Sequence, residues 1–442
     1  MRRGVSLTPP HQTVAGETVR TDQHALGFGR RELAARATTL LGGAAASVAL
    51  AGPAAAQQAA AKAEAPPLPV ASGLTYQHIG RWDVARLNKI LTVDMPAFTG
   101  FKVDYKPAQN AVNLYRVAYP SVIPEQNNRP TMTSGLIAIP ETGDKAMPMV
   151  SYQHGTVYLK EQAPSFPEKS PETQLMIAQF AGRGDVVVGA DYFGLGLSTE
   201  PEGYIVMGSH QQATADMIRA GRAILAARGI GVTRLCIAGW SQGGLVTMAL
   251  LKRLEEDGVA VKAAATASAP VDPFVALNGY LNFPRPNAAS WINSLFILSA
   301  FSYENYYGVP GLAEALINPA YLDICRQFYE KKPIDYNAVP TDLHKLIRPE
   351  YFNSQYFARS EYGRLMKEAQ GYRWVIQTPT RNYFGGSDEA VSPGLAKLVV
   401  DYQQAIGSDK VTAVSAGDDA NHRGTYARAA LDWKTWFDTL AG

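Results

Sequence analysis

The most constraining feature of this sequence is the segment Arg-Leu-Cys-Ile-Ala-Gly-Trp-Ser-Gln-Gly-Gly-Leu at residues 234–245. Its apolar first half is short and ends at turn residues, which is typical of a buried β-strand, whereas residues 242–254 have an apolar face with helical periodicity. A chain that passes directly from strand to helix must turn sharply at Ser241, and Gly239 and Gly243 keep side chains out of the crowded turn. The segment therefore predicts a nucleophile elbow that exposes the Ser241 hydroxyl.

The pattern Gly-x-Ser-x-Gly specifies only three positions and also occurs by chance, so a chemical role for Ser241 requires partner residues elsewhere. Asp388 follows a predicted strand at 379–384, and His422 follows the last predicted strand at 410–415. Sites of open α/β sheets form at the carboxyl ends of strands, so we expect these three side chains to lie together. The order predicts that His422 takes the proton of Ser241 and that Asp388 orients and stabilises His422.

Three other carboxylates compete with Asp388 for this role: Glu389, Asp418 and Asp419. The last two are too close to His422 in the sequence to lie at a different strand end. The turn at 385–391, which precedes a predicted helix, favours Asp388 over Glu389.

Two backbone N–H groups are candidates for stabilising an oxyanion. The N–H of Gln242 follows the serine, and the N–H of Thr156 lies in the loop after the predicted strand at 147–152. The loops around these groups are expected to bind substrate, with the residues His154, Gly155, Trp240 and Tyr192. His154 is expected to bond loop backbone rather than to act as an acid or a base.

The pattern of strands and helices predicts an α/β fold with a mostly parallel central sheet and helices on both faces. Strands are expected at 112–119, 132–139, 147–152, 185–190, 234–240, 259–267, 379–384 and 410–415, the first two as an edge hairpin. Helices are expected at 74–91, 171–182, 211–229, 242–254, 394–404 and 426–440. Residues 271–372 are rich in aromatic and aliphatic side chains and predict a helical cap, with helices at 312–317, 321–329 and 341–347.

The composition is that of a globular protein: 46% of the 442 residues are hydrophobic, 18% are charged and the net charge is +2. A charge so near neutrality gives no indication of nucleic acid as a partner. The two cysteines, Cys236 and Cys325, are expected to be free, and no metal cluster or phosphate-binding loop is present in the sequence. We therefore expect no metal and no cofactor.

The first 56 residues are expected to be an export signal of the twin-arginine type. Arg30 and Arg31 precede an uncharged Ala- and Gly-rich stretch at 37–61, and small residues around Ala56 suit a signal peptidase. A membrane anchor is the alternative, but Pro53 interrupts a stretch that is only weakly apolar, so we expect no stable membrane insertion. Residues 57–72 are expected to be a linker, and 73–270 with 373–442 a catalytic domain.

On the segments at 153–156 (QHGT), 191–196 (DYFGLG), 239–243 (GWSQG) and 385–391 (GGSDEAV), and on the loop at His422, the chain resembles the α/β-hydrolases. Within them it is most similar to secretory lipases typified by yeast lipase A and to their bacterial relatives. At His154-Gly155 it departs from the yeast lipases and is closer to the generic hydrolase loop.

The resemblance implies an exported enzyme with Ser241, Asp388 and His422 as its triad, which hydrolyses a small-molecule or lipid ester without a cofactor. Two alternatives remain open from the residues: a serine peptidase of the same fold, and a hydrolase-fold binding protein without catalysis.

Overall fold

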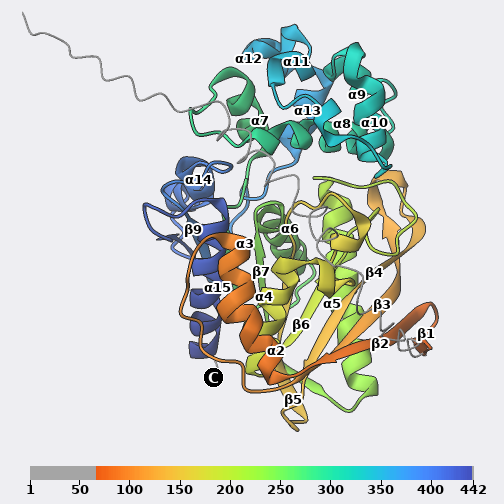
Figure 1. Ribbon diagram of the computed structural model, residues 1–442, viewed down its shortest axis with the longest axis vertical. Coiled ribbons are helices and arrows are strands. Elements are labelled where there is room, and N and C mark those ends of the chain that lie inside the picture. The colour runs from red at the N-terminus through yellow and green to blue at the C-terminus, as the bar shows by residue number, and fades with distance from the viewer. Residues whose placement is uncertain (1–65, 441–442) are drawn as a thin grey trace, which may run out of the picture. The chain divides into compact units, whose positions relative to one another are not determined.

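A ten-stranded sheet with the order β1-β2-β3-β4-β6-β5-β7-β8-β9-β10 runs through the centre of the protein (Figure 1). The computed structural model describes residues 66–440, so the predicted export signal and most of the predicted linker lie outside the described residues. The pairs β1–β2, β2–β3, β3–β4 and β4–β6 are antiparallel. The remaining neighbours in the sheet, β6–β5, β5–β7, β7–β8, β8–β9 and β9–β10, are parallel. The strands are β1 (Leu68–Ala71), β2 (Leu74–Trp82), β3 (Val112–Ile123), β4 (Arg129–Pro140), β5 (Ala146–Gln153), β6 (Val186–Ala190), β7 (Gly231–Trp240), β8 (Ala263–Ala267), β9 (Thr380–Phe384) and β10 (Val411–Ser415).

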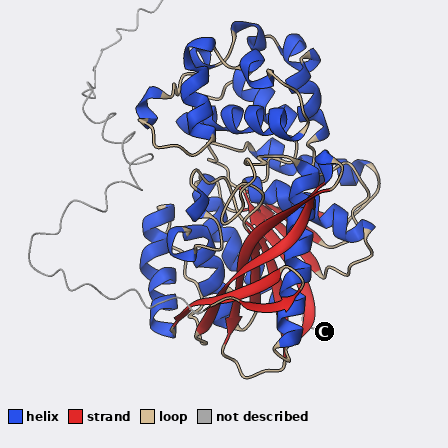
Figure 2. Cartoon of the chain, turned by 90° about the vertical axis from the view of Figure 1, so that its right-hand side faces the viewer, coloured by secondary structure: helices blue, strands red, loops and turns tan. Residues whose placement is uncertain are grey.

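The central strands are buried because helices cover both faces of the sheet (Figure 2). Successive side chains of a strand point to opposite faces, and in β6 Val186 and Val188 join one core cluster while Val187 joins the other. One face is covered by α2 (Val84–Lys89), α3 (Met95–Thr99), α4 (Pro171–Gln179) and α15 (His422–Thr439). The other is covered by α5 (Met207–Ala227), α6 (Gln242–Glu256) and α14 (Pro393–Ala405). The predicted mostly parallel α/β sheet is confirmed.

A group of helices is inserted between β8 and β9, at the end of the sheet where β7 and β8 finish (Figures 1 and 2). These helices have their own apolar core, which also contacts Phe193 and the segment 204–206 beneath it. They are α7 (Pro273–Asn282), α8 (Asn293–Tyr306), α9 (Leu312–Leu316), α10 (Leu322–Tyr329), α11 (Leu343–Leu346), α12 (Ser354–Arg359) and α13 (Glu361–Glu368). All of them lie within the insertion predicted at 271–372.

The N-terminal part of the fold differs from the prediction. Residues 74–82 form β2 rather than a helix, because they pair along most of their length with β3. The β3–β4 hairpin is consequently not at the edge of the sheet, since β2 and β1 lie outside it. Leu68–Ala71, at the end of the predicted linker, forms β1.

The last helix also begins earlier than predicted. Asn421 caps α15 by accepting a hydrogen bond from the N–H of Gly424, so that His422 is the first residue of the helix rather than part of a loop.

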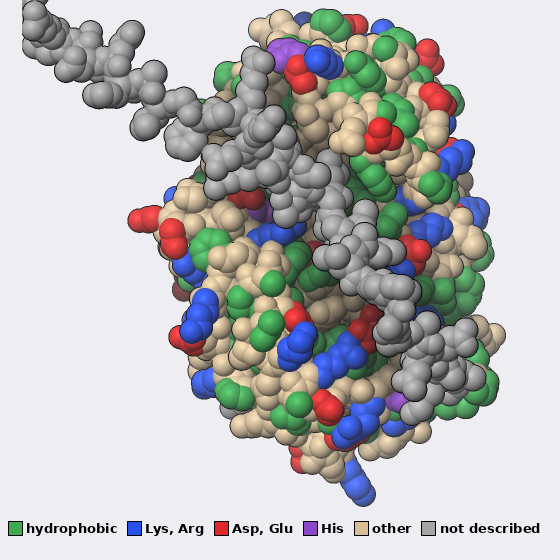
Figure 3. Space-filling view, in the orientation of Figure 1, with side chains coloured by type: hydrophobic (Ala, Val, Ile, Leu, Met, Phe, Trp, Pro, Cys, Tyr) green, Lys and Arg blue, Asp and Glu red, His purple; other side chains and the backbone are tan. Residues whose placement is uncertain are grey.

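The described surface mixes charges of both signs. On the face seen in Figure 3, Lys and Arg side chains are interspersed with Asp and Glu. Within residues 66–440, none of the helices combines the length and the apolar character needed to span a bilayer.

Candidate active site

Ser241 occupies a strained turn between β7 and α6. Its backbone has φ 58° and ψ −126°, which is unusual for a residue with a side chain. The flanking glycines are required by close approach: a Cβ at Gly239 would lie 2.2 Å from the carbonyl oxygen of Gly243, and one at Gly243 would lie 1.9 Å from that of Gln153. This is the backbone geometry predicted for the elbow.

The three predicted catalytic side chains lie in one hydrogen-bonded series. Ser241 Oγ is 2.9 Å from His422 Nε2, and His422 Nδ1 is 3.0 and 3.1 Å from the two carboxylate oxygens of Asp388. All three residues are buried, with exposed fractions of 9%, 3% and 1% for Ser241, His422 and Asp388. This arrangement allows the imidazole to accept the serine proton while the carboxylate holds its tautomer.

The rival carboxylates occupy other positions. Asp388 also accepts hydrogen bonds from Ser268 Oγ and from the N–H groups of Ala390 and Val391. Glu389 accepts a hydrogen bond from the backbone N–H of His422, not from its ring. Asp419 forms an exposed ion pair with Arg428. Of the four candidates, Asp388 is the carboxylate bonded to the imidazole.

The electrostatics of the series favour an ionised acid and a basic imidazole. Burial lowers the pKa of His422, but the charge and hydrogen bond of Asp388, with the charges of Glu389 and Glu172, outweigh it and raise the pKa above the ordinary 6.5. For Asp388, burial raises the pKa, but His422 and Ser268 outweigh it and the pKa is lowered.

A small cavity of about 30 Å³ lies beside Ser241. Gln242 and Thr156, the predicted oxyanion residues, line it together with the serine. The cap helices and the loop at 385–391 that carries Asp388, called the acid loop below, supply most of the remaining wall, which is largely apolar. These residues are Tyr204, Ile205, Pro270, Pro273, Ala276, Leu277, Tyr280, Trp291, Leu295, Ala390 and Val391.

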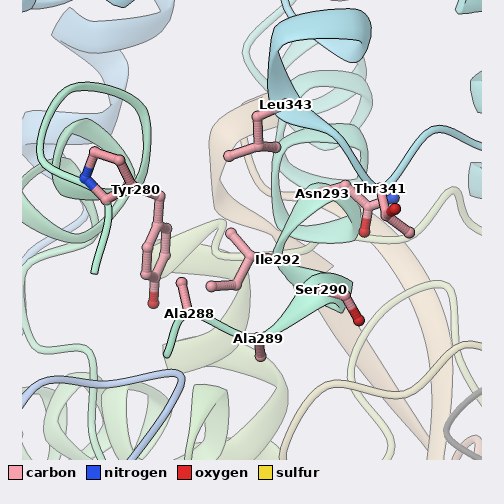
Figure 4. A pocket seen from close by; sticks show the side chains of 9 residues that line it. Tyr280, Ala288, Ala289, Ser290, Ile292, Asn293, Thr341 and Leu343 are labelled. Atoms are coloured by element: carbon pink, nitrogen blue, oxygen red, sulfur yellow. The ribbon is translucent and has the colours of Figure 1, made fainter. Parts of the chain in front are cut away.

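A second cavity of about 170 Å³ lies within the cap (Figure 4). Tyr280 lines both cavities. The ring of Tyr280 and the side chains of Ser290, Asn293 and Thr341 lie around the second one.

The four residues predicted to bind substrate are not among those lining the cavity beside Ser241. His154 is buried, and its ring stacks on that of Tyr192 with 4.1 Å between the ring centroids. The Tyr192 hydroxyl donates a hydrogen bond to the His154 carbonyl. Trp240 donates through Nε1 to the carbonyl of His422. The Gly155 N–H donates to Glu172. The four residues are thus bonded within the fold, and of their contacts given above the one from Trp240 reaches a residue of the Asp388–His422–Ser241 series.

Sequence reasoning missed several residues of the site. Trp291 and Tyr280 belong to the aromatic-rich insertion, whose aromatic residues are expected as a group to form a pocket wall or the insertion's own core, but the sequence does not single out these two. Ser268 and Glu172 lie outside any motif, and their roles come from contacts with distant residues. Burial raises the pKa of Glu172 to about 7, against hydrogen bonds from Tyr152 and Gly155 that lower it.

No protein-family model matches the sequence, and the search of curated proteins also finds no match. Solved structures do match. A protein of Legionella pneumophila assigned as a hydrolase superposes with a TM-score of 0.72 at 20% identity, over 83% of this chain and 98% of that one. The rice cell wall degrading esterase LipA from Xanthomonas oryzae superposes with a TM-score of 0.68 at 20% identity, over 84% of this chain and 98% of that one. Candida antarctica lipase A superposes with a TM-score of 0.55 at 16% identity, over 78% of this chain and 77% of that one. The chain therefore has the α/β-hydrolase fold, in a form similar to that of these esterase and lipase structures.

Proposed function

We propose that this protein is a serine hydrolase that cleaves carboxylic esters through an acyl-enzyme. The observation that carries the proposal is the series Asp388–His422–Ser241, which ends at a cavity with apolar walls. The similarity of the fold to an esterase and a lipase supports the same chemistry.

In the proposed reaction, His422 Nε2 accepts the Ser241 proton as Oγ attacks the ester carbonyl carbon. The resulting oxyanion accepts hydrogen bonds from the backbone N–H groups of Gln242 and Thr156, each worth roughly 3 kcal/mol of transition-state stabilisation. The tetrahedral intermediate collapses as the alcohol leaves with the proton from His422. A water molecule, activated by His422, then hydrolyses the acyl-serine, and Asp388 stabilises the imidazolium in both halves.

The size of the cavity suggests a short acyl group. The cavity beside Ser241 has a volume of only about 30 Å³. With Trp291, Leu295 and Leu277 forming its wall, this space accepts acetyl or butyryl groups more readily than long chains. Hydrolysis of long-chain esters would require the cap to move.

The proposal is tested with p-nitrophenyl esters from acetate to palmitate, using the wild type and Ser241→Ala. We expect hydrolysis that peaks at short chains and is lost in the variant, and labelling of Ser241 alone by a fluorophosphonate probe. If neither protein hydrolyses any ester and the probe does not react, the esterase proposal fails. Cleavage of peptide p-nitroanilides instead would identify a peptidase, and complete inertness with retained folding would favour a binding protein.

We also propose, from the sequence alone, that the protein is exported through the twin-arginine route. The pair Arg30-Arg31 and the uncharged stretch that follows support this proposal. Replacement of both arginines by lysine should leave the protein in the cytoplasm of a bacterial host. Unchanged export of that variant would contradict it.

A further inference from the structure

Glu172 is a buried carboxylate whose charge helps to raise the pKa of His422, but it takes part in no step of the reaction above. It lies at the second position of α4, and its Oε2 atom accepts hydrogen bonds from the Tyr152 hydroxyl (2.6 Å) and the Gly155 N–H (2.9 Å). Its own carbonyl accepts a hydrogen bond from the hydroxyl of Tyr426 in α15. A buried carboxylate is costly unless such bonds satisfy it.

The Gly155 N–H belongs to the peptide just before the one that carries the Thr156 N–H. That second peptide is also held, because the Gly155 carbonyl oxygen lies 2.7 Å from His154 Nδ1. Burial lowers the pKa of His154 to about 4, so the ring is neutral and donates one hydrogen bond. The ring has two carbonyl partners, and the Gly155 oxygen is the closer one, since the Asp191 carbonyl oxygen lies 3.2 Å from His154 Nε2.

The carbonyl oxygen and the N–H of one trans peptide point in opposite directions. The bond from His154 to the Gly155 oxygen therefore directs the Thr156 N–H away from His154. Thr156 lines the cavity beside Ser241, and its hydroxyl lies 2.9 Å from that of Tyr204 on the cavity wall.

Gly155 is the single flexible joint between these two peptides. A glycine backbone has more accessible conformations than any other residue, so its direction depends on what holds it. Glu172 lies close against it: a Cβ at Gly155 would approach Glu172 Oε1 to 3.0 Å and the Trp240 carbonyl to 3.4 Å. The carboxylate thus holds one side of the joint, and His154 holds the other.

We propose that Glu172 is a positioning residue for the oxyanion site: it holds the Gly155 N–H so that the Thr156 N–H faces the carbonyl oxygen of the substrate. This inference rests on the proposed ester hydrolysis. Glu172 acts through the backbone and does not touch the reacting atoms. Its loss affects the transition state, in which the oxyanion forms, more than the binding of the substrate.

Three substitutions separate this role from a merely structural one. In Glu172→Gln, the amide oxygen can replace Oε2 and accept both hydrogen bonds. In Glu172→Asp, the shorter side chain withdraws the carboxylate from Gly155, and in Glu172→Met the acceptor is absent. If Glu172→Met does not fold, the kcat of Glu172→Gln compared with that of Glu172→Asp still tests whether an acceptor beside the Gly155 N–H is needed. Asp185→Asn is the control, because Asp185 is another buried carboxylate, which pairs with Lys434 and precedes the amino end of β6, whereas Ser241 follows the carboxyl end of β7.

The measurements are kcat and KM for p-nitrophenyl butyrate, inhibition by 1-butaneboronic acid, whose serine adduct places an oxygen in the oxyanion site, and Tm. We expect Glu172→Asp and Glu172→Met to lower kcat by about 10- to 100-fold and to leave KM nearly unchanged. The inhibition constant of the boronic acid should rise by a similar factor. Glu172→Gln should stay within about threefold of the wild type. Asp185→Asn should change Tm but not kcat.

The proposal is overturned if folded Asp and Met variants keep the kcat and the boronic acid affinity of the wild type. It is also overturned if Gln loses as much kcat as Met, because the charge or the packing would then matter rather than the acceptor. Failure of the proposed function gives a different result: the wild type itself shows no hydrolysis that depends on Ser241.

Discussion

The hydroxyl of Ser268 donates a hydrogen bond of 2.5 Å to Oδ2 of Asp388, 120 positions further along the chain. Ser268 follows β8 directly and has a positive φ of 47°, and its hydroxyl reaches the loop after β9. The Asp388 carboxylate is therefore held from the neighbouring strand end as well as by His422 and by the N–H groups of its own turn. Such support keeps the carboxylate ionised and directed at the imidazole.

Replacement of Ser268 by alanine should remove this hydrogen bond and lower the free energy of unfolding by about 1.5–3 kcal/mol, as expected for a hydrogen bond to a charged group. Urea unfolding monitored by tryptophan fluorescence measures the change. Ser268→Gly loses the same hydroxyl but tolerates the positive φ, so it should be less destabilised than Ser268→Ala. Equal stability of Ser268→Ala and the wild type would show that the hydroxyl contributes nothing.

The pH dependence of hydrolysis should follow the imidazole of His422. The pKa of His422 is raised above 6.5, and only the neutral imidazole can accept the serine proton, so kcat/KM should rise with pH to a plateau with its midpoint above 6.5. The negative charge of Glu389 helps to raise the pKa of His422. Glu389→Gln removes this charge and disfavours the imidazolium, so the midpoint of the profile should move to lower pH. Asp419→Asn is the control, because Asp419 is exposed and paired with Arg428. A midpoint that moves upward in Glu389→Gln would contradict the assignment.

The cap is hydrogen-bonded to three consecutive carbonyl groups of the acid loop. Arg285 Nη1 donates to the carbonyl of Asp388, the Ala289 N–H to that of Glu389, and the Tyr280 hydroxyl to that of Ala390. Arg285→Ala should therefore loosen the acid loop and lower kcat by about tenfold, because small misplacements of reacting groups are costly.

The matched control for Arg285 is Arg348→Ala. Arg348 also donates to a carbonyl, that of Glu314, but both residues belong to the cap. Steady-state kinetics and Tm of the two variants distinguish the cases: a loss of kcat in both, or in neither, would show that the contact with the acid loop has no special role.

Two glycines test the geometry of the elbow against ordinary helix propensity. A Cβ at Gly239 would overlap the Gly243 carbonyl, so Gly239→Ala should cost about 1–3 kcal/mol of stability or more and abolish hydrolysis. A Cβ at Gly279, in α7, would meet nothing within 4 Å, so Gly279→Ala should be neutral or stabilising by up to about 1 kcal/mol. Thermal unfolding of both variants gives the comparison, and a stable, active Gly239→Ala would refute the packing argument.

The sequence by itself determined the elements whose signals are local. The need for glycine at 239 is local, because a Cβ there would meet the carbonyl oxygen of Gly243 in the same turn, whereas the need at 243 comes from the carbonyl oxygen of Gln153 in the neighbouring strand β5. The periodicity of 242–254 is likewise a property of one helix, and the order Ser241, Asp388, His422 follows from which strand each residue succeeds. Parallel strands end at the same edge of the sheet, so this order predicts that the three groups lie at that edge.

Only the tertiary structure decided the elements that depend on pairing and burial. Residues 74–82 became a strand because β3 was available to pair with them, and nothing in their own sequence records that partner. Glu172 and Ser268 acquired their contacts from residues 17 and 120 positions away, and the wall of the cavity combines residues from 156 to 391. The physical reason is that hydrogen bonds and cavities form between surfaces that meet only when the chain is packed, whereas turn strain and helical periodicity act between neighbours.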